Sequence, residues 1–507
     1  MKQYLIAIDI GTQGTKCILF DTEMNVIADS FEISNLISDK PGMLKQDPLE
    51  IYASCIHTIK AVMEKSDINP IDVCAIGIDG QMAGILGVDA QGEASTYYDS
   101  WLDTRCGKYV KEMKEKAGKK IIEITGGVTS YTHGPKILWW KNEQPCAYQN
   151  THKFVLPHNY VIGKMCGLKG DDAVFDYTCI HFSGFGDNQR KEWSQELLEI
   201  FGVDKSKMAR IVSPFEVVGK TTKEFARESG LIEGISVVAG AGDTAAGTFG
   251  SGLIEKGMLL DSAGTASVMC CVVDEYKPDT QNETMMQMPS PIDGLWLPLS
   301  YIGGGGLCVR WFRDEFTGKP AASYDELMAE AQEVSAGSEG VLFTPHFAGR
   351  AYPSNPYVKG SFIGLDWKHT RGHLYRAVME GIAYEYDYYY SILKEQYPTV
   401  DFKKMYTIGG GSKSSLFNSI KADVLGLPVT PYKQGETALV GSAVIAGYGT
   451  GVFSDYRKPL LKVSEEGSTV QPNMENHDSY KKYAREYLNV IKALDCIYKS
   501  DVYQIEG

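Results

Sequence analysis

The sequence has no excess of positive charge and no long uncharged apolar stretch. Asp+Glu 64 against Lys+Arg 50 gives a net charge of −14, which argues against nucleic acid or an anionic membrane as a partner. No apolar stretch reaches the about 18 residues that a membrane span needs. Asp9 interrupts the N-terminal apolar run too early for a signal peptide. We therefore expect a cytoplasmic protein with neither membrane nor nucleic acid among its partners.

Cysteine patterns that bind zinc or form a disulfide framework are also missing. The eleven cysteines are an odd number without a CxxC pair, which is typical of reduced thiols. His369 and His373 have helical i,i+4 spacing, but no third ligand accompanies them, so no metal site is predicted there. The glycine and lysine pattern of a P-loop is absent too. An anionic ligand such as ATP would need local backbone amides, magnesium and a few cations instead.

The length and an internal similarity predict two lobes of related fold. A chain of 507 residues is too long for one hydrophobic core. A strand, a Gly-Thr turn and a second strand occur around Gly11-Thr12 and again around Gly264-Thr265, 253 residues later. Strand-like runs at 73–78, 153–156, 236–239 and 405–408 alternate with helical patterns at 48–65, 324–334 and 479–498. This alternation favours α/β lobes, with a boundary near 253–256.

Two segments rich in small residues, 243–252 and 435–449, are predicted to be helices that approach each other closely. Glycine costs a helix about 1 kcal/mol relative to alanine, so a run of small residues indicates close backbone contact. If the helices cross between the lobes, they form a hinge. Tight packing without motion is the alternative.

The segment Asp9-Ile-Gly-Thr-Gln-Gly-Thr-Lys16 offers the parts of a phosphate site. Backbone amides from Gly11 to Gly14, the Thr12 hydroxyl and the Lys16 cation can face phosphate oxygens. Asp9 ends an apolar strand and is placed to hold Mg²⁺, directly or through water. The alternative for Asp9 is a carboxylate that only caps the turn.

Asp243 is the candidate general base. It lies where a strand leads into the first small-residue helix, and phosphoryl transfer needs a carboxylate that orients and deprotonates the attacking hydroxyl. We expect Asp243 and Asp9 to act from opposite sides of a cleft. A helix N-cap is the structural alternative for Asp243.

The same segment also allows a different class of protein. Residues 240–245 fit the dinucleotide pattern GxGxxA, and Asp261 follows 18 residues after Asp243, as an NAD-dependent oxidoreductase would require. However, Asp243 occupies the loop where a pyrophosphate would lie, and this reading leaves the Asp9 segment unexplained. An actin-like or sugar-sensing ATPase without a phosphorylated product is a third hypothesis.

Two further glycine-rich turns predict a nucleotide pocket in the second half. Residues 406–421 read as a strand, a turn with three glycines and a helix start, and residues 301–306 contain four glycines before another helix. Such turns allow a flat or phosphorylated ligand to approach the main chain.

Together these motifs resemble the FGGY carbohydrate kinases. Segment 360–365 (Gly-Ser-Phe-Ile-Gly-Leu) and segment 373–380 (His-Leu-Tyr-Arg-Ala-Val-Met-Glu) look like the family's C-terminal signature. Segment 135–143 (Pro-Lys-Ile-Leu-Trp-Trp-Lys-Asn-Glu) is similar to its N-terminal signature, although His133 stands where a smaller residue is usual. The resemblance implies two ribonuclease-H-like, actin-like ATPase lobes around a central cleft. Residues 1–254 would bind sugar and 255–507 ATP, with the C-terminal helix as a candidate to pack back on the first lobe.

The resemblance also implies a set of site residues. Asp243 would be the base, and the cofactors would be ATP and Mg²⁺, the latter at Asp9. The nucleotide would contact Gly11, Thr12, Gln13, Gly14, Lys16, Gly264, Thr265, Gly306, Gly410, Gly411 and Ser415. The sugar would contact Gln81, Met82, Ala83, Trp101, Asp103, Arg105 and Thr244.

Three polar positions depart from the xylulokinases, to which the likeness is greatest. Their patterns GQMHG and WNDGR have a histidine at Ala83 and an asparagine at Leu102, and an asparagine is usual at Thr244. Because a buried hydroxyl without a partner is costly, D-xylulose itself is in doubt, and a pentulose or other short ketose is the predicted class. A sugar acid, a polyol or a deoxy-ketose is the alternative. The oligomeric state is open, a homodimer being one option.

Overall fold

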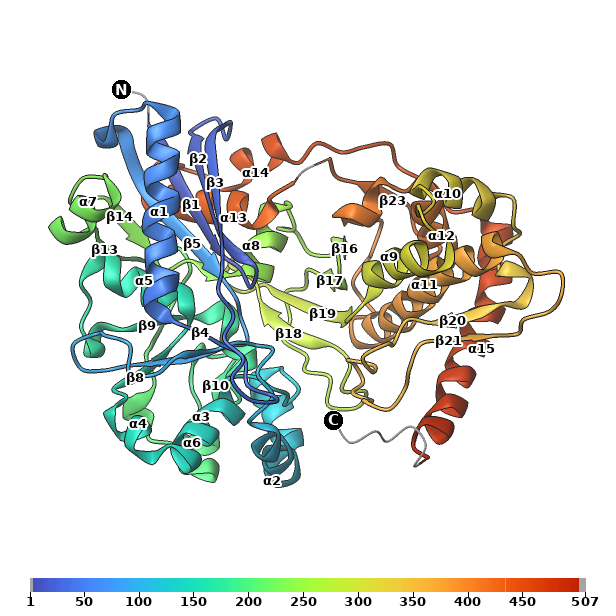
Figure 1. The fold of residues 1–507 in the computed structure, drawn as a ribbon, viewed down its shortest axis with the longest axis horizontal. Helices are drawn as coiled ribbons and strands as arrows, with labels where there is room; N and C mark the ends of the chain where they lie inside the picture. The colour runs from blue at the N-terminus through green and yellow to red at the C-terminus, as the bar shows by residue number, and fades with distance from the viewer. Residues whose placement is uncertain (1–2, 434, 501–507) are drawn as a thin grey trace.

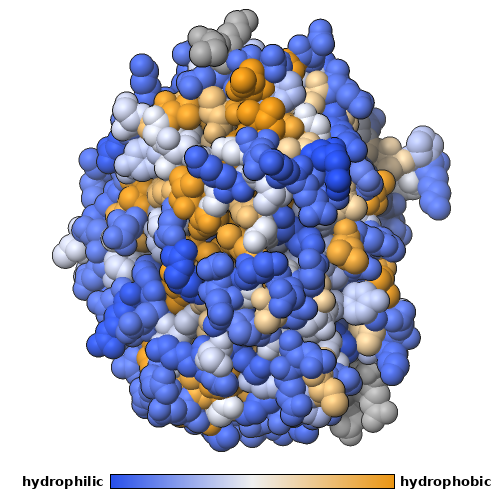
Figure 2. All heavy atoms as spheres, turned by 90° about the vertical axis from the view of Figure 1, so that its left-hand side faces the viewer, coloured by the Kyte–Doolittle hydropathy of each residue, from blue (hydrophilic) through white to orange (hydrophobic). Residues whose placement is uncertain are grey.

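The computed structural model describes residues 3–433 and 435–500, which form two α/β lobes (Figure 1). The first lobe contains the N-terminal half of the chain, and most of the C-terminal half forms the second lobe. No helix among these residues is long and apolar enough to cross a membrane. Hydrophilic side chains cover most of the outer face of the first lobe, with hydrophobic groups between them (Figure 2).

The first lobe is built on a mixed sheet in the order β13-β14-β5-β1-β2-β3, with β15 also paired to β5. Its strands are β1 (Tyr4–Ile10), β2 (Gly14–Asp21), β3 (Val26–Ile33), β5 (Val73–Gly80), β13 (Val217–Lys220), β14 (Ser236–Val238) and β15 (Ala241–Gly242). β1 is antiparallel to β2 and parallel to β5. The carboxyl ends of β1 and β5 therefore meet at one edge of the sheet.

The second lobe repeats this arrangement, as the two Gly-Thr turns predicted. Its sheet has the order β18-β19-β17-β16-β22-β23. The strands are β16 (Leu259–Ala263), β17 (Ser267–Cys271), β18 (Met286–Pro289), β19 (Trp296–Ile302), β22 (Met405–Ile408) and β23 (Val429–Pro431). The hairpin β16–β17 lies beside the parallel strand β22, just as β1–β2 lies beside β5.

Helices and short elements complete both lobes. The first lobe has α1 (Pro48–Ser66), α2 (Gly107–Thr125), α3 (His133–Glu143), α4 (Pro145–Asn150), α5 (Pro157–Cys166), α6 (Gln195–Phe201), α7 (Lys223–Ser229) and α8 (Asp243–Gly250). From the second half come α9 (Gly305–Phe316), α10 (Tyr324–Gln332), α11 (Arg371–Gln396), α12 (Ser415–Leu425), α13 (Thr437–Gly449), α14 (Arg457–Val463) and α15 (Met474–Tyr498). The short strands are β4 (Lys45–Gln46), β6 (Leu86–Val88), β7 (Tyr98–Asp99), β8 (Lys153–Val155), β9 (Val174–Asp176), β10 (Gly186–Asp187), β11 (Glu192–Trp193), β12 (Arg210–Val212), β20 (Leu342–Thr344) and β21 (Ser361–Ile363). The 3₁₀ turns are η1 (Pro70–Asp72), η2 (Gly170–Asp172), η3 (Tyr177–Phe182), η4 (Lys205–Lys207), η5 (Ser338–Gly340) and η6 (Gly410–Lys413).

The two small-residue helices, α8 and α13, pack directly against each other. A Cβ atom added to Gly441 would lie 2.0 Å from the Ala246 carbonyl, and one on Gly250 would lie 1.9 Å from the Thr437 carbonyl. Only glycine therefore allows this approach. The predicted close contact is confirmed, while hinge motion stays a prediction.

The C-terminal half does not stay wholly within the second lobe. Helix α13 packs on β5 and β1 of the first lobe, where a Cβ on Gly77 would meet the Ser442 carbonyl at 2.1 Å (Figure 1). The C-terminal helix α15 instead packs on α11, α12 and β20 of the second lobe. The expectation that the C-terminal helix returns to the first lobe is thus wrong, and α13 makes that return.

Candidate active site

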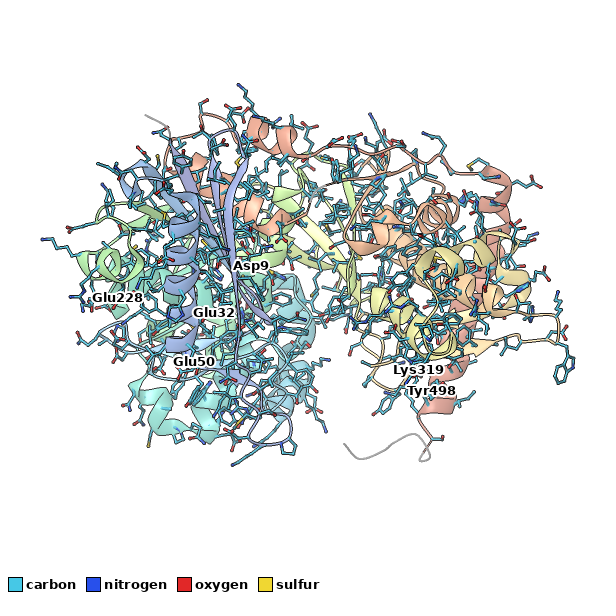
Figure 3. All side chains as sticks on the ribbon, turned by 45° about the horizontal axis from the view of Figure 1, so that its top comes forward. Asp9, Glu32, Glu50, Glu228, Lys319 and Tyr498 are labelled. Carbon is cyan, nitrogen blue, oxygen red and sulfur yellow. The ribbon has the colours of Figure 1, made fainter. Side chains whose placement is uncertain are left out.

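Three carboxylates gather where the central strands of the first lobe end. Asp9 on β1 and Asp79 on β5 are direct neighbours in the parallel register. Strand β15 extends the sheet beside Asp79, and Asp243 follows as the first residue of α8. In Figure 3 the labelled Asp9 lies on the side of its lobe that faces the second lobe.

Asp79 was not predicted from the sequence. Its signal is the Ile-Asp ending that β5 shares with β1, but only the parallel pairing of these strands shows that the two carboxyl groups meet. The Ser442 hydroxyl on α13 donates to Asp79 Oδ2 at 2.6 Å. Asp79 thus connects the helix that returns from the second half with the strand end that carries Asp9.

Burial shapes the protonation of this pair. Burial, followed by the charge of Asp243, raises the pKa of Asp9 to about 7, against a lowering effect of its hydrogen bond with Asp79. Burial and the charge of Asp9 hold the pKa of Asp79 well above its usual range. When both side chains are ionised, the buried Oδ1 atoms of Asp9 and Asp79 accept no hydrogen bond from any of the described residues. They suit either a shared proton or a hard cation such as Mg²⁺.

Asp243 has the properties that a base needs. Part of the residue is exposed, but the burial of the rest raises the pKa of its carboxyl group. Hydrogen bonds from Thr244 and the charge of His158 act in the opposite direction. Its Oδ1 accepts from the Thr244 amide at 2.5 Å and the Thr244 hydroxyl at 3.0 Å. Gly242 is the N-cap of α8, and the helix has no side-chain cap. The N-cap alternative for Asp243 is therefore wrong.

Predicted sugar and phosphate residues meet in one chain of hydrogen bonds. Trp101 Nε1 donates to Thr12 Oγ1 at 2.8 Å, and Thr12 donates to Gln81 Oε1 at 3.1 Å. Gln81 Nε2 in turn donates to Gln46 Oε1 at 2.9 Å. The structure thus links Trp101 and Gln81 through Thr12, three residues after Asp9.

Asp103 and Arg105, both predicted to contact sugar, bind each other, and their contact with a sugar stays a prediction. Arg105 Nε lies 2.8 Å from Asp103 Oδ2, and its Nη2 lies 2.6 Å from Asp99 Oδ1. Asp103 also accepts from the Leu44 amide at 2.8 Å. These side chains fix the loop that carries Trp101, and the charge of Arg105 is already balanced.

Met82 and Ala83 begin the loop that follows β5. A Cβ on Gly242 would lie 2.5 Å from the Met82 side chain, so Met82 packs beside the residue that precedes Asp243. His133 Nε2 donates to the Met82 carbonyl at 2.5 Å, and burial lowers the pKa of His133 to about 3. A neutral histidine from α3 thus supports this loop, while Ala83 next to it is partly exposed.

The second lobe contains a cavity of about 630 Å³ at the predicted nucleotide position. Its lining includes Gly264, Thr265, Gly306, Gly410 and Gly411, which were assigned to the nucleotide from the sequence. Ser415 is not part of the lining, but the preceding residue is. Unpredicted lining residues include the aromatic side chains Tyr324, Tyr375 and Phe417 and the cations Arg310 and Lys413. The glycines give main-chain access and the rings give apolar walls for a flat base.

The turn after β1 is less open than the sequence predicted. The Gly11 amide donates to the Gly14 carbonyl at 3.0 Å, so that amide is not free for a phosphate. Gly14 is buried in β2, where an added Cβ would lie 2.4 Å from the Phe31 ring. Gln13 is exposed at the tip of the turn. Lys16 is the residue of β2 that pairs with Asp9 of β1, and its Nζ atom lies 2.6 Å from the Glu436 carboxylate.

Models of one protein family match both halves of the chain. The model for the N-terminal domain of the FGGY family of carbohydrate kinases matches residues 4–250, and the model for its C-terminal domain matches residues 261–450. The chain belongs to this family. It is therefore a carbohydrate kinase, a phosphotransferase that uses ATP.

Relatives of this carbohydrate kinase act on different substrates. The xylulose kinase of Bacillus subtilis is 27% identical over 96% of each chain, and the gluconokinase of the same organism is 25% identical over 90% of this chain and 89% of its own. The glycerol kinase of Deinococcus radiodurans is 27% identical over 97% of this chain and 98% of its own. The crystal structure of gluconate kinase from Lactobacillus acidophilus has a TM-score of 0.91 at 24% identity, covering 98% and 99% of the two chains. These matches establish that the chain is a carbohydrate kinase with this fold, but they do not identify the sugar that it phosphorylates.

The dinucleotide hypothesis fails for this carbohydrate kinase on structural grounds too. Asp261, its proposed ribose ligand, lies fully buried in the second lobe, 2.6 Å from Lys421. Tyr386 and Thr407 donate to the same carboxylate at 2.6 and 2.8 Å. Within the described residues no group of three or more His, Cys, Asp or Glu side chains is arranged to hold a metal by itself, and the absence of a metal site at His369 and His373 stays a prediction.

Proposed function

We propose that this kinase transfers the γ-phosphoryl group of MgATP to a hydroxyl of a small neutral ketose, most readily a pentulose. The observation that carries this proposal is the position of Asp243. It is a partly exposed carboxylate with a raised pKa, placed at the edge of the sheet beside Asp9 and supported by Thr244. A carboxylate with a pKa shifted toward neutral pH is suited to take a hydroxyl proton.

In the proposed step the sugar oxygen attacks the γ-phosphorus. The new O–P bond forms as the bond to the ADP oxygen breaks and ADP takes the electron pair, while the hydroxyl proton moves to Asp243. Asp9 would hold Mg²⁺, because its buried Oδ1 lacks a donor among the described residues and magnesium prefers such oxygens. When bound, the ion neutralises phosphate charge. Trp101 and Gln81 would orient the sugar.

Local charge favours a neutral sugar over a sugar acid. Asp9, Asp79 and Asp243 gather at the strand ends, and Arg105, the nearest predicted cation on the sugar side, is already paired with Asp99 and with Asp103. A substrate carboxylate would meet repulsion from these three carboxylates, and Arg105 is not free to balance it. A polyol or a deoxy-ketose meets no such penalty, so these remain the alternatives within the family.

A substrate panel tests this assignment. Purified protein with MgATP should release ADP with pentuloses at a higher kcat/KM than with gluconate or glycerol, and phosphorus NMR should identify a sugar phosphate ester. Because three polar positions differ from the xylulokinases, pentuloses other than D-xylulose belong in the panel. A gluconate kcat/KM tenfold above that of every ketose would overturn the neutral-sugar proposal.

A further inference from the structure

A buried histidine and aspartate form a pair behind the candidate base. His158 on α5 and Asp176 at the end of β9 are both fully buried, and His158 Nε2 lies 2.7 Å from Asp176 Oδ2. A carboxylate can only accept a hydrogen bond, so Nε2 is the donor. Neither residue was singled out from the sequence, and the phosphoryl transfer described above does not use them.

The second oxygen of Asp176 continues the chain of bonds toward α8. Asp176 Oδ1 accepts from the Thr178 amide at 3.0 Å and also from the Thr178 hydroxyl. The Thr178 hydroxyl donates its hydrogen to Asp176, so its oxygen is free to accept a hydrogen bond from the Gly242 amide at 2.9 Å. Gly242 is the N-cap residue of α8, and Asp243 comes next. The chain therefore ends on the backbone that holds the base.

The other imidazole nitrogen lies against the strand that pairs with the segment before Asp243. His158 Nδ1 is buried without a hydrogen-bond partner among the described residues. It lies against Gly80, where an added Cβ would approach Nδ1 to 3.2 Å, and Gly80 is the β-sheet partner of Gly242. His158 is also the imidazole whose charge acts on the Asp243 carboxyl. A buried polar atom is rarely left without a function or a partner.

We propose that His158 and Asp176 are positioning residues for Asp243, acting through the hydroxyl of Thr178 and the amide of Gly242. The inference rests on the proposed function of Asp243 as the base. The pair fixes the backbone position at which α8, and with it the base, begins. Displacing a base by about 1 Å is enough to slow a reaction by about 10²-fold, so the position of this backbone matters for the rate.

Asn159, the next residue on α5, provides a matched contrast. Its side chain is also buried, donates to the Ala239 carbonyl at 3.1 Å and accepts from the Asp176 amide at 3.3 Å. It thus joins the same segments by backbone contacts, but it does not reach the Gly242 amide. Replacing Asn159 therefore tests packing of this region without cutting the chain of bonds from Asp176 to the base.

A double-mutant cycle between His158→Gln and Asp243→Asn tests the proposal. His158→Gln alone should lower kcat about 10- to 100-fold, with the KM values for sugar and MgATP changed little. In the Asp243→Asn background the same replacement should lower the residual kcat less than about twofold, because the carboxylate that His158 positions is no longer present. Asn159→Ala should lower the melting temperature, with an equal effect on kcat in both backgrounds.

If His158→Gln fails to fold, Thr178→Val provides the test, since it removes only the hydroxyl link. Thr178→Ser, which keeps the hydroxyl, should restore most of the lost kcat. A His158→Gln or Thr178→Val effect of equal size in both backgrounds would overturn the inference while leaving the base assignment intact. Near-normal kcat in Asp243→Asn alone would instead contradict the base assignment, so the two failures are distinguishable.

Discussion

Lys16 and Glu436 join the two halves of the chain by an ion pair of 2.6 Å, 420 residues apart in sequence. Lys16 follows the turn after β1, and Glu436 is the N-cap residue of α13, with a left-handed backbone (φ 58°) that is uncommon for a residue other than glycine. The cation that the sequence predicts for ATP phosphates is thus bound to a carboxylate in this arrangement. Phosphate binding would have to replace this partner.

We therefore predict that Glu436→Gln lowers the KM for MgATP. An exposed ion pair is weak, so the expected decrease is about 1.5- to 5-fold, with the sugar KM unchanged. Glu466→Gln, which breaks the comparable pair with Lys404 at 3.0 Å, is the control and should have no effect. Initial rates at varied MgATP measure the change. An unaltered KM in Glu436→Gln would show that Lys16 does not contact the nucleotide.

Asp9→Asn should lower kcat more than sugar affinity, because Asp9 is expected to serve magnesium and not the sugar. Activity of the native protein should be lost on chelation and return with added Mg²⁺. Kinetics over a magnesium titration, together with sugar binding by calorimetry, separate the two effects. Full activity of the variant at ordinary magnesium would remove Asp9 from the mechanism.

Asp243→Asn should reduce kcat by about 10²–10⁴, the usual contribution of a general base. Asparagine keeps the size of the side chain but cannot accept the hydroxyl proton, so the sugar dissociation constant and the melting temperature should change little. Rapid-quench kinetics and thermal unfolding of the same variant provide the measurements. More than about a tenth of native kcat would contradict the assignment.

Ala83→His combined with Thr244→Asn should increase kcat/KM for D-xylulose relative to the preferred sugar. Thr244 contacts Asp243, the proposed base, and Ala83 lies in the loop after β5, so the added groups would offer hydrogen bonds to a xylulose hydroxyl. Competition between two sugars in one reaction gives the ratio directly. If the ratio stays constant, these positions do not determine specificity.

Closure of the lobes about α8 and α13 should accompany binding of both substrates. The glycines bring the backbones of these helices into direct contact, and we expect one backbone to slide on the other as a hinge. Small-angle X-ray scattering with sugar and a non-hydrolysable ATP analogue should show a smaller radius of gyration than the free protein. Gly441→Val, which would clash with the Ala246 carbonyl, should reduce this change. An unchanged radius in the native protein would count against the hinge.

Local sequence patterns predicted much of the fold and part of the site. The strands at Tyr4–Ile10 and Val73–Gly80 and the helix at Pro48–Ser66 follow from runs of apolar residues and from periodicity, which neighbouring residues carry by themselves. The glycines that line the candidate nucleotide cavity were also predictable, because Gly410 and Gly411 belong to a glycine-rich turn between a strand and a helix, which is typical of a tight turn or of close approach by a ligand.

The α/β lobes, their duplication, the reaction class and the candidate residues Asp9 and Asp243 were therefore all predictable from local patterns and motifs. The folded chain was needed to show that Asp79 lies beside Asp9, that Arg105 binds Asp99 and Asp103, and that His158 pairs with Asp176. The reason is physical. Local patterns record backbone propensity and burial, whereas the partner of a polar group depends on strand register and helix packing between segments far apart in the chain.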